Sequence, residues 1–343
     1  MKVLFIGGTG IISEAVTKQA IMEGIDLYLF NRGQQPEFIP EGAKLIKGDI
    51  RDKESAAEVL KNHTFDVVVD WVAYIPEHIK TDIELFRSRT LQYIFISSAS
   101  AYQKPSSHYL ITESTPLVNP YWEYSRNKIA CEELLMNEYR NTGFPVTIVR
   151  PSTTYGMTLI PSSINSAIHP WSLVDRMRKG KKIIVHGDGT SLWTITHNSD
   201  FAKGFIGLLN NSQAIGHAFH ITSDEVLSWD QIYRTIGNAA GVEPQLIHIP
   251  SDFIALFDPD ATGYLLGDKV VSIIFDNSKI KRFVPGFNAT VSLSRGVKQT
   301  IQWFENHPER CTVDDRWNII MDKIINAYEQ VFNKDNNNCA VRR

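Results

Sequence analysis

Short apolar runs alternate with segments of helical periodicity along the first part of the chain. Val3–Ile6 is a continuous apolar run that ends at two glycines, which is typical of a strand buried in a parallel sheet. In Ser13–Met22 the apolar residues recur at helical spacing, and Gly24 is placed to end that helix. Leu27–Phe30 is a second apolar run, so these elements predict a βαβ unit of about 30 residues.

The same alternation continues as far as residue 151. We expect further strands near 43–46, 66–74, 94–100 and 146–151, and a helix over 55–60. Strands that alternate with helices predict an α/β fold with a doubly wound parallel sheet of the Rossmann type.

After residue 156 the pattern becomes less regular, because prolines, serines and asparagines interrupt it. We therefore expect a Rossmann domain over residues 1–156. A smaller C-terminal region over 157–330 is expected to be mainly substrate-binding, with some segments returning to the Rossmann sheet. Residues 331–343 are polar and are expected to form a tail.

A glycine motif, G-x-x-G-x-x-S, lies between the first strand and the first helix. Gly7 can adopt the positive φ of a tight turn, and Gly10 lets the backbone approach a pyrophosphate at the helix N-terminus. Ser13 stands where a third glycine is common. Because the motif lies in a βαβ unit, we interpret it as a dinucleotide-binding loop rather than a glycine turn without a ligand.

Composition narrows the class of protein further. The chain has 35 basic and 38 acidic residues and a net charge of −3, so no overall field favours nucleic acid or a membrane surface. Three cysteines without C-x-x-C spacing fit reduced thiols better than disulfides or a zinc site. The first apolar run is too short for a signal segment or a membrane span. We expect a cytoplasmic protein without a metal.

Tyr124 and Lys128 form a Y-x-x-x-K pair in the stretch YWEYSRNK. This spacing places both side chains on one face of a helix. A tyrosine with a pKa of about 10 is a poor base, and a neighbouring ammonium favours its phenolate. By itself the spacing also fits a solvated helix face.

With GGTGII at its start, SSASAY at 97–102 and this Y-x-x-x-K, the sequence resembles the extended branch of the short-chain dehydrogenase/reductase superfamily. It is similar to the NAD-dependent epimerase/dehydratase family, including UDP-glucose 4-epimerases. Ser98 precedes Tyr124 by 26 positions (124 − 98), close to the family spacing. The resemblance implies that Tyr124 exchanges a proton with the substrate, that Lys128 lowers the pKa of Tyr124 and holds the nicotinamide ribose, and that Ser98 orients the substrate oxygen.

The resemblance also implies which residues bind the cofactor. An acidic residue usually closes the second strand and holds the ribose 2′-hydroxyl, but Asn31 stands there, followed by Arg32. Arg32 can pair with a 2′-phosphate or stack on adenine, so we expect NADP rather than NAD; an exposed arginine without contacts is the alternative. The implied cofactor-binding set is Gly7, Thr9, Gly10, Ile11, Ile12, Asn31, Arg32, Asp49, Ile50, Trp71, Val72, Ala73, Lys128, Pro151 and Ser152.

Two departures from the family concern the substrate. Ala99 and Ser100 stand where dehydratases carry an acidic pair, so we do not expect sugar 4,6-dehydration. Trp193 and Thr194 stand where nucleotide-sugar epimerases usually carry Arg-Asp, whose arginine grips the diphosphate. Trp193 can stack on a sugar, or it can pack at the domain junction. We take Ser100 and Trp193 as substrate contacts.

Two further groups of polar residues leave alternatives open. Lys279, Lys281 and Arg282 form either a solvated face or contacts to an anionic substrate. His197 and Asp200 are an isolated pair, for which a structural role is favoured over metal binding.

Together these features predict an NAD(P)-dependent oxidoreductase or epimerase that acts on a secondary alcohol or ketone of a sugar or sugar-like small molecule. Arg32 favours a reductase. The alternative is a non-catalytic dinucleotide-binding regulator or an RNA-binding relative of the same fold. The intact Tyr124–Lys128 pair and the absence of a basic stripe argue against it. The resemblance also implies a homodimer, with the helix that bears Tyr124 as the candidate interface.

Overall fold

The computed structural model describes residues 1–34 and 36–340, and for Glu37 and residues 332–340 it describes the backbone alone. The chain divides into two compact units that interleave along the sequence. The N-terminal unit comprises Met1–Gly156, Thr194–Glu225 and Ile274–Val291, and the C-terminal unit comprises Met157–Trp193, Val226–Ile273 and the chain from Ser292 onward. The boundary after residue 156 stays a prediction.

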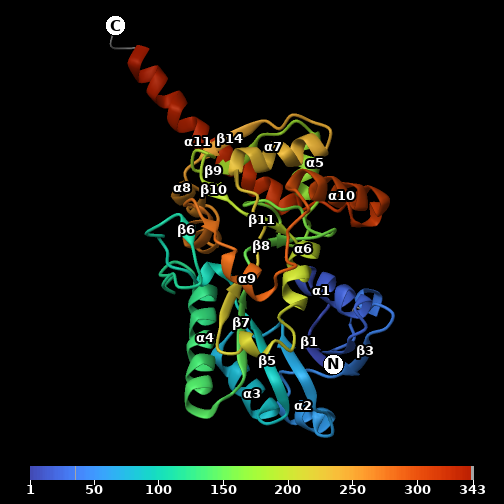
Figure 1. Cartoon of the computed structure of the whole chain (residues 1–343). Helices are drawn as coiled ribbons and strands as arrows, with labels where there is room; N and C mark the ends of the chain where they lie inside the picture. Colours follow the sequence, from blue (N-terminus) through green and yellow to red (C-terminus); the bar gives the residue numbers. More distant parts are fainter. Residues whose placement is uncertain (35, 341–343) are drawn as a thin grey trace. The chain divides into compact units, whose positions relative to one another are not determined.

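The N-terminal unit is built on a seven-stranded parallel sheet in the order β12-β7-β5-β4-β1-β2-β3 (Figure 1). Its strands are β1 (Lys2–Ile6), β2 (Asp26–Asn31), β3 (Lys44–Lys47), β4 (Phe65–Asp70), β5 (Thr90–Ile96), β7 (Val146–Arg150) and β12 (Ala218–His220). The strand order reverses between β1 and β4, which is where Rossmann-type sheets bind their ligands. The predicted fold class is confirmed.

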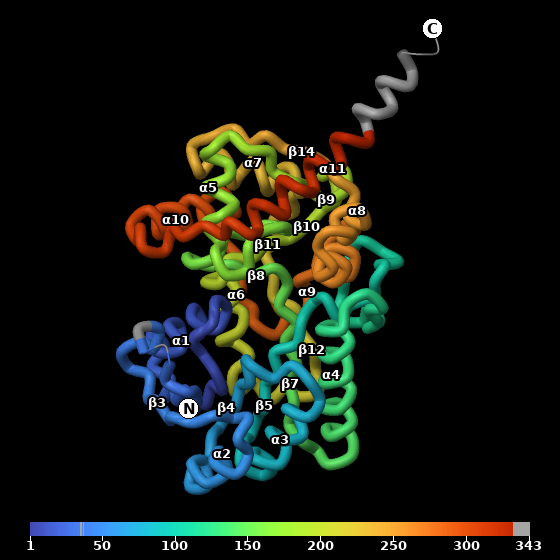
Figure 2. The backbone as a smooth tube through the Cα atoms, turned by 180° about the vertical axis from the view of Figure 1, so that it is seen from behind, coloured from blue at the N-terminus to red at the C-terminus, as the bar shows by residue number. Residues whose placement is uncertain are grey.

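Helices cover both faces of this sheet, as Figure 2 shows from behind. On one face lie α1 (Ile11–Met22) and α6 (Asn198–Ile206), which pack with alternate strand residues such as Val3 and Phe5. On the other face lie α2 (Lys53–Leu60), α3 (Pro76–Phe86) and α4 (Glu123–Thr142), packed with the intervening residues. Nearly every strand residue in the centre of the sheet is buried on both sides, which explains the continuous apolar runs.

Short elements complete the N-terminal unit. Two strand pairs are parallel: β6 (Leu110–Ile111) with β15 (Ile274–Phe275), and β8 (Thr153–Tyr155) with β11 (Ile195–His197). Single helical turns are η1 (Pro36–Phe38), η2 (Ala99–Ala101) and η3 (Ser212–Ala214), and α9 (Ser278–Phe283) is a short helix.

The C-terminal unit has its own apolar core, which includes Ile184, Ile249 and Ile324. Its strands pair as β9 (Ile183–His186) with β14 (Leu246–Ile249), and β10 (Leu192–Trp193) with β13 (Leu227–Ser228). Its helices are α5 (Ser172–Arg178), α7 (Trp229–Ala239), α8 (Ser251–Ala255), the π-helix η4 (Thr262–Lys269), α10 (Leu293–Asn306), η5 (Pro308–Arg310) and α11 (Asp315–Ala340).

Several element boundaries differ from those predicted; the strand expected at 66–74, for example, is β4, which ends at Asp70. The strand expected at 94–100 is β5, which begins at Thr90 and ends at Ile96, because Ser98 caps the turn η2 through its hydroxyl. Helix α11 continues to Ala340 and so runs into the expected polar tail, of which residues 341–343 lie outside the described residues. None of the helices within the described part of the chain is long and apolar enough to cross a membrane.

Candidate functional site

The loop between β1 and α1 depends on two adjacent glycines. Gly7 has φ +97° and Gly8 has φ +94°, a backbone conformation that favours glycine. A Cβ added to Gly8 would lie 2.7 Å from Leu29 Cδ2, so Gly8 also permits close packing of the loop on the sheet. The predicted turn at Gly7 is present. The motif G-x-x-G-x-x-S did not include Gly8, although the sequence shows two adjacent glycines.

Ser13 stabilises the start of α1. The Gly10 N–H donates to Ser13 Oγ (2.9 Å), and the Ser13 hydroxyl lies 3.2 Å from the Gly10 carbonyl. This local pairing is why α1 begins at Ile11, two residues before the expected start. The first turn of α1 presents backbone N–H groups and the positive end of the helix dipole toward the sheet edge, as an anion site requires.

A cavity of about 550 Å³ lies over this loop within the N-terminal unit. Its lining residues come from the glycine loop, the ends of β4, β5 and β7, and the first turns of α4. They are Gly7, Gly8, Thr9, Gly10, Ile11, Ile12, Ser13, Trp71, Val72, Tyr74, Ile96, Ser97, Ser98, Tyr124, Lys128, Pro151, Ser152 and Thr154. The structure thus brings together twelve of the residues predicted from the sequence around one cavity, which we name the loop cavity.

Other predicted cofactor residues lie outside the lining of the loop cavity. Asn31 donates from Nδ2 to the Gly7 carbonyl (3.3 Å), so it holds the glycine loop in place. Arg32 is exposed. Asp49 accepts the backbone N–H of Arg51 (2.9 Å), and Ile50 is buried.

A buried carboxylate, Asp70 at the end of β4, holds the turn that follows. Its Oδ1 accepts the N–H groups of Val72 (2.5 Å) and Ala73 (2.8 Å). Asp82 on α3 is fully buried nearby, and burial, reinforced by the Asp70 charge, raises the pKa of Asp82 well above its ordinary range. Sequence reasoning missed Asp70, although an acid at the end of an apolar strand was a usable signal.

Lys128 is almost entirely buried, with 2% of its surface exposed. Its ammonium donates to the carbonyls of Ala73 and Ile96, both at 2.7 Å. The ammonium also lies 4.7 Å from the ring centroid of Tyr74 and 5.7 Å from that of Tyr124. Burial lowers the pKa of Lys128 to about 8. Lys128 is therefore a cation fixed beside the Tyr124 ring at neutral pH.

Aromatic rings surround Tyr124 at the start of α4. Its ring centroid lies 4.9 Å from that of Trp122 and 6.3 Å from that of Tyr74. The Tyr74 side chain is 47% exposed, and burial of the remainder raises the pKa of its phenol. Neither Trp122 nor Tyr74 was predicted. Trp122 lies two residues before Tyr124 in the sequence, whereas Tyr74 reaches Tyr124 from the segment between β4 and α3.

Serine hydroxyls form a connected group beside the loop cavity. Ser98 Oγ lies 2.9 Å from Ser100 Oγ, and Ser125 on α4 donates to Ser100 Oγ (2.7 Å). Asn119 donates from Nδ2 to the Ser100 carbonyl (2.9 Å). Ser98 lines the loop cavity, whereas Ser100 is buried behind it and holds Ser98 in position.

A buried ion pair joins the middle of α4 to the end of β7. The Arg150 guanidinium contacts the Glu132 carboxylate at 2.6, 2.9 and 3.2 Å, and Ser97 donates its hydroxyl to Glu132 Oε1 (2.5 Å). The two charged side chains are only 6% and 3% exposed. This pair connects α4 to β5 and β7, the strands whose ends carry Ser98 and Pro151.

Trp193 belongs to the C-terminal unit and is 1% exposed. Its ring packs on Trp229, with 5.6 Å between centroids and 32° between planes. This packing lies inside the C-terminal unit, and both the substrate contact of Trp193 and its packing at the domain junction stay predictions.

Asp200 fulfils a structural role. Its Oδ2 accepts the N–H groups of Thr290 (3.0 Å) and Val291 (2.8 Å), and its Oδ1 pairs with Lys203 (2.7 Å). Asp200 thereby fastens residues 290–291 to α6. Over residues 1–34 and 36–340 the structure contains no group of three or more side chains suited to hold a metal ion.

A Rossmann sheet with a glycine loop, and a tyrosine–lysine helix over the same cavity, defines the class of short-chain dehydrogenases and reductases. The chain belongs to the NAD dependent epimerase/dehydratase family, whose model matches residues 3–222. It is 28% identical over 344 residues to a UDP-glucose 4-epimerase of Lactobacillus helveticus, covering 90% of this chain and 98% of that protein.

Two other proteins are similar to this chain over most of its length. A chloroplast stem-loop binding protein of 41 kDa from Arabidopsis thaliana is 28% identical over 267 residues, covering 74% of this chain and 67% of that protein. The structure of a UDP-glucuronic acid 4-epimerase from Bacillus cereus, in complex with UDP-glucuronic acid and NAD, has a TM-score of 0.71 at 19% identity. That match covers 90% of this chain and all of the other, and it shows a shared fold.

Proposed function

We propose that this chain is an NAD(P)-dependent oxidoreductase or epimerase that acts on a secondary alcohol or ketone of a sugar-like substrate, with Tyr124 as its acid/base group. One observation supports this most strongly. Tyr124, Lys128 and Ser98, which come from α4 and the end of β5, line the same cavity as the glycine loop. A proton donor and a dinucleotide loop around one cavity are what hydride transfer to or from a carbonyl carbon requires.

In the proposed reaction Tyr124 exchanges the proton of the substrate hydroxyl. The Lys128 ammonium, fixed 5.7 Å from the Tyr124 ring centroid, favours the phenolate by its charge. Ser98 donates or accepts a hydrogen bond at the substrate oxygen, and Ser100 and Ser125 hold it there. The nicotinamide cofactor supplies the hydride acceptor or donor when it is bound.

The residues present fit a dinucleotide. Gly7 and Gly8 bring the backbone to the cavity without side chains, and an added Cβ at Gly7 would lie only 3.0 Å from Val72 Cγ1. The start of α1 favours a pyrophosphate there. Asn31 carries no charge to repel a 2′-phosphate, and exposed Arg32 follows it, so we propose a preference for NADP over NAD.

The substrate class follows from the family and from the aromatic surroundings of Tyr124. Epimerases in the family act on sugar nucleotides such as UDP-glucose. The rings of Tyr74 and Trp122 beside Tyr124 offer apolar surfaces on which a sugar face can pack. We include Ser100 and Trp193 as substrate contacts, a homodimer through α4 and a cytoplasmic location in the proposal, and we do not expect 4,6-dehydration.

Cofactor content and preference test this proposal. The absorbance spectrum of the purified protein reveals retained cofactor, and fluorescence titration measures the affinity for NADPH and for NADH. We expect exchangeable NADPH to bind, and Arg32→Ala to weaken it about tenfold or more through the loss of a charge-assisted hydrogen bond. Lys47→Ala is a matched control, because Lys47 is an exposed cation on the neighbouring strand β3.

The possible results distinguish between the parts of the proposal: the NADP preference, the catalytic role and dinucleotide binding itself. Tightly retained NAD(H), insensitive to Arg32→Ala, contradicts the NADP preference and supports an epimerase that recycles its own cofactor. NADPH binding with no oxidoreductase or epimerase activity toward sugar nucleotides, and no effect of Tyr124→Phe, contradicts the catalytic role. Binding of neither dinucleotide contradicts the whole proposal.

A second candidate function, RNA binding, is favoured by the similarity to the stem-loop binding protein. A gel-shift titration with an RNA stem-loop, at several salt concentrations, tests it. Binding with a steep salt dependence supports this candidate, since phosphate contacts release counterions.

A further inference from the structure

A second cavity of about 990 Å³ lies within the N-terminal unit, at the sheet edge formed by β12. Its walls come from the loop after β6, the second half of α4, β7, β12 and α9. It shares no lining residue with the loop cavity in the part of the chain that the structure describes. We name it the edge cavity; its volume is at the upper end of the range of small-molecule sites.

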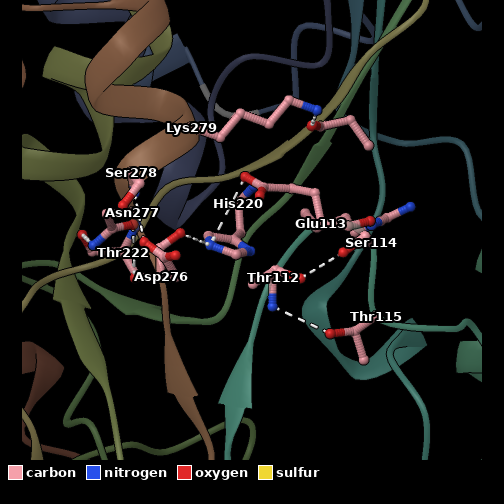
Figure 3. Close-up of polar contacts among 12 residues, drawn as sticks. Thr112, Glu113, Ser114, Thr115, His220, Thr222, Asp276, Asn277, Ser278 and Lys279 are labelled. Carbon is pink, nitrogen blue, oxygen red and sulfur yellow. Dashed lines mark hydrogen bonds and ion pairs between the residues drawn. The ribbon is translucent and has the colours of Figure 1, made fainter.

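The inner carboxylates of the edge cavity already have partners in the protein. Glu132 is neutralised by Arg150. Glu113 accepts the backbone N–H of His220 (3.4 Å), and the His220 ring lies 3.8 Å from it (Figure 3). Asp276 accepts the N–H of Ser278 (2.8 Å). Glu132 thus has a cation as its partner, whereas Glu113 and Asp276 accept backbone N–H groups.

The cations of the edge cavity have a different environment. Lys279 on α9 is half-buried, and its ammonium donates to the Ala218 carbonyl (2.8 Å) and lies 4.8 Å from the Phe219 ring centroid. Arg282 follows one turn later and is exposed. Among the side chains that the structure describes, neither has a carboxylate within ion-pair distance, and the same is true of Arg140 on α4.

Electrostatics around Lys279 agree with this geometry. Burial lowers the pKa of Lys279, Glu113 opposes the shift, and Arg150 and Arg282 add to it. The protein thus desolvates the Lys279 ammonium without fully compensating its charge. An anion bound in the cavity would supply this compensation. The lining holds four carboxylates (Glu113, Glu132, Glu133 and Asp276) and four cations (Arg140, Arg150, Lys279 and Arg282), so an anion would be held by the local positions of Lys279 and Arg282 and not by an overall excess of positive charge.

We propose that the edge cavity binds a small organic anion, whose phosphate or carboxylate group lies between Lys279 and Arg282. The apolar body of this ligand packs on Met136, Ile148 and Phe283, which line the same cavity. Arginine takes such groups through two parallel hydrogen bonds, and lysine acts as a point charge beside it. The ligand is distinct from the cofactor and from the substrate of the loop cavity.

The fluorescent probe 8-anilino-1-naphthalenesulfonate tests this proposal, because it combines an anionic group with an aromatic body. Its dissociation constant is measured with the full chain and with Lys279→Gln and Arg282→Gln. Lys281→Gln is the matched control, since Lys281 lies on the same helix but pairs with Asp224 (2.7 Å) and does not line the cavity. We expect at least a fivefold weaker affinity in each test variant and a change under twofold in the control.

Displacement of the probe identifies the chemistry of the anion. Displacement by inorganic pyrophosphate indicates a phosphate ligand, and displacement by citrate indicates a carboxylate ligand; displacement by neither overturns the proposal. Equal affinities in all variants, or an equal loss in Lys281→Gln, also overturn it, since the probe then binds elsewhere. Arg282→Gln decides the matter if Lys279→Gln does not fold, because the Arg282 side chain is exposed.

Discussion

Replacing Arg150 by methionine removes one partner of the buried ion pair and leaves the Glu132 charge inside the protein. The Glu132 side chain is 3% exposed and loses three contacts to the guanidinium. Breaking a buried pair by removing one partner costs about 3–5 kcal/mol of stability. Because Ser97 still donates to Glu132, we expect a loss of about 3 kcal/mol in the free energy of unfolding.

Replacement of both partners gives a different result. The variant Arg150→Met with Glu132→Leu has no buried charge left without a partner. We expect it to be more stable than Arg150→Met alone by about 1–2 kcal/mol, because packed apolar side chains often replace a buried pair at little cost. The exposed pair Lys281–Asp224, whose side chains are 43% and 50% exposed, is the control. Lys281→Gln is expected to cost less than about 1 kcal/mol.

Urea unfolding followed by circular dichroism measures these differences. Since the chain forms two compact units, the transition is fitted with a step for each unit. A loss below about 1 kcal/mol in Arg150→Met would refute the reasoning, because the buried pair would then behave like the exposed one. A double variant less stable than Arg150→Met would refute it as well.

Three further predictions concern the loop cavity. Burial lowers the folded-state pKa of Lys128 to about 8, so between pH 8 and the unfolded value of 10.5 the unfolded chain binds more protons and stability rises with pH. In urea titrations the free energy of unfolding of the wild type, relative to that of Lys128→Met, should rise by roughly 3 kcal/mol over that interval. If this relative free energy does not change with pH, Lys128 does not behave as a buried cation. Gly24→Ala, at φ +71° and with open space around the added Cβ, should lower the free energy of unfolding by about 1–2 kcal/mol. Gly8→Ala, whose added Cβ meets Leu29, should lower it by about 1–3 kcal/mol more, and equal losses would exclude the close contact. Asp70→Ala frees two N–H groups of the turn after β4 and should weaken NADPH binding severalfold by fluorescence titration, and an unaltered affinity would argue against a role for this turn.

The sheet was predictable because its signal is local. Apolar runs such as Val3–Ile6 are buried on both faces, and each is followed by a helix or a turn that the sequence also marks. Strand β12 was harder to predict, since three residues carry little periodicity and their partner β7 is far away in the chain. The observed helix boundaries differ from the predicted ones where a side chain caps the backbone, as Ser13 does at the start of α1.

The candidate site was predictable where a motif specifies it. Tyr124 and Lys128 lie four residues apart on one helix, so their proximity follows from helix geometry alone. Tyr74 comes from the segment between β4 and α3 and reaches Tyr124 through the fold, whereas Trp122 lies two residues before Tyr124 in the sequence. Lys281 forms an exposed ion pair, whereas Lys279 and Arg282 on the same helix line the edge cavity, and their contact with an anionic substrate stays a prediction.

The late position of β12 in the chain has a consequence for synthesis on the ribosome. His220 ends β12 and follows the end of β7, Arg150, by 70 residues (220 − 150), which takes roughly 4–14 s to translate. During that interval β7 forms an open edge of the nascent sheet, with its backbone N–H and C=O groups available to other strands. The sheet is therefore completed late in translation, and slowed elongation between these residues should increase aggregation of the nascent chain.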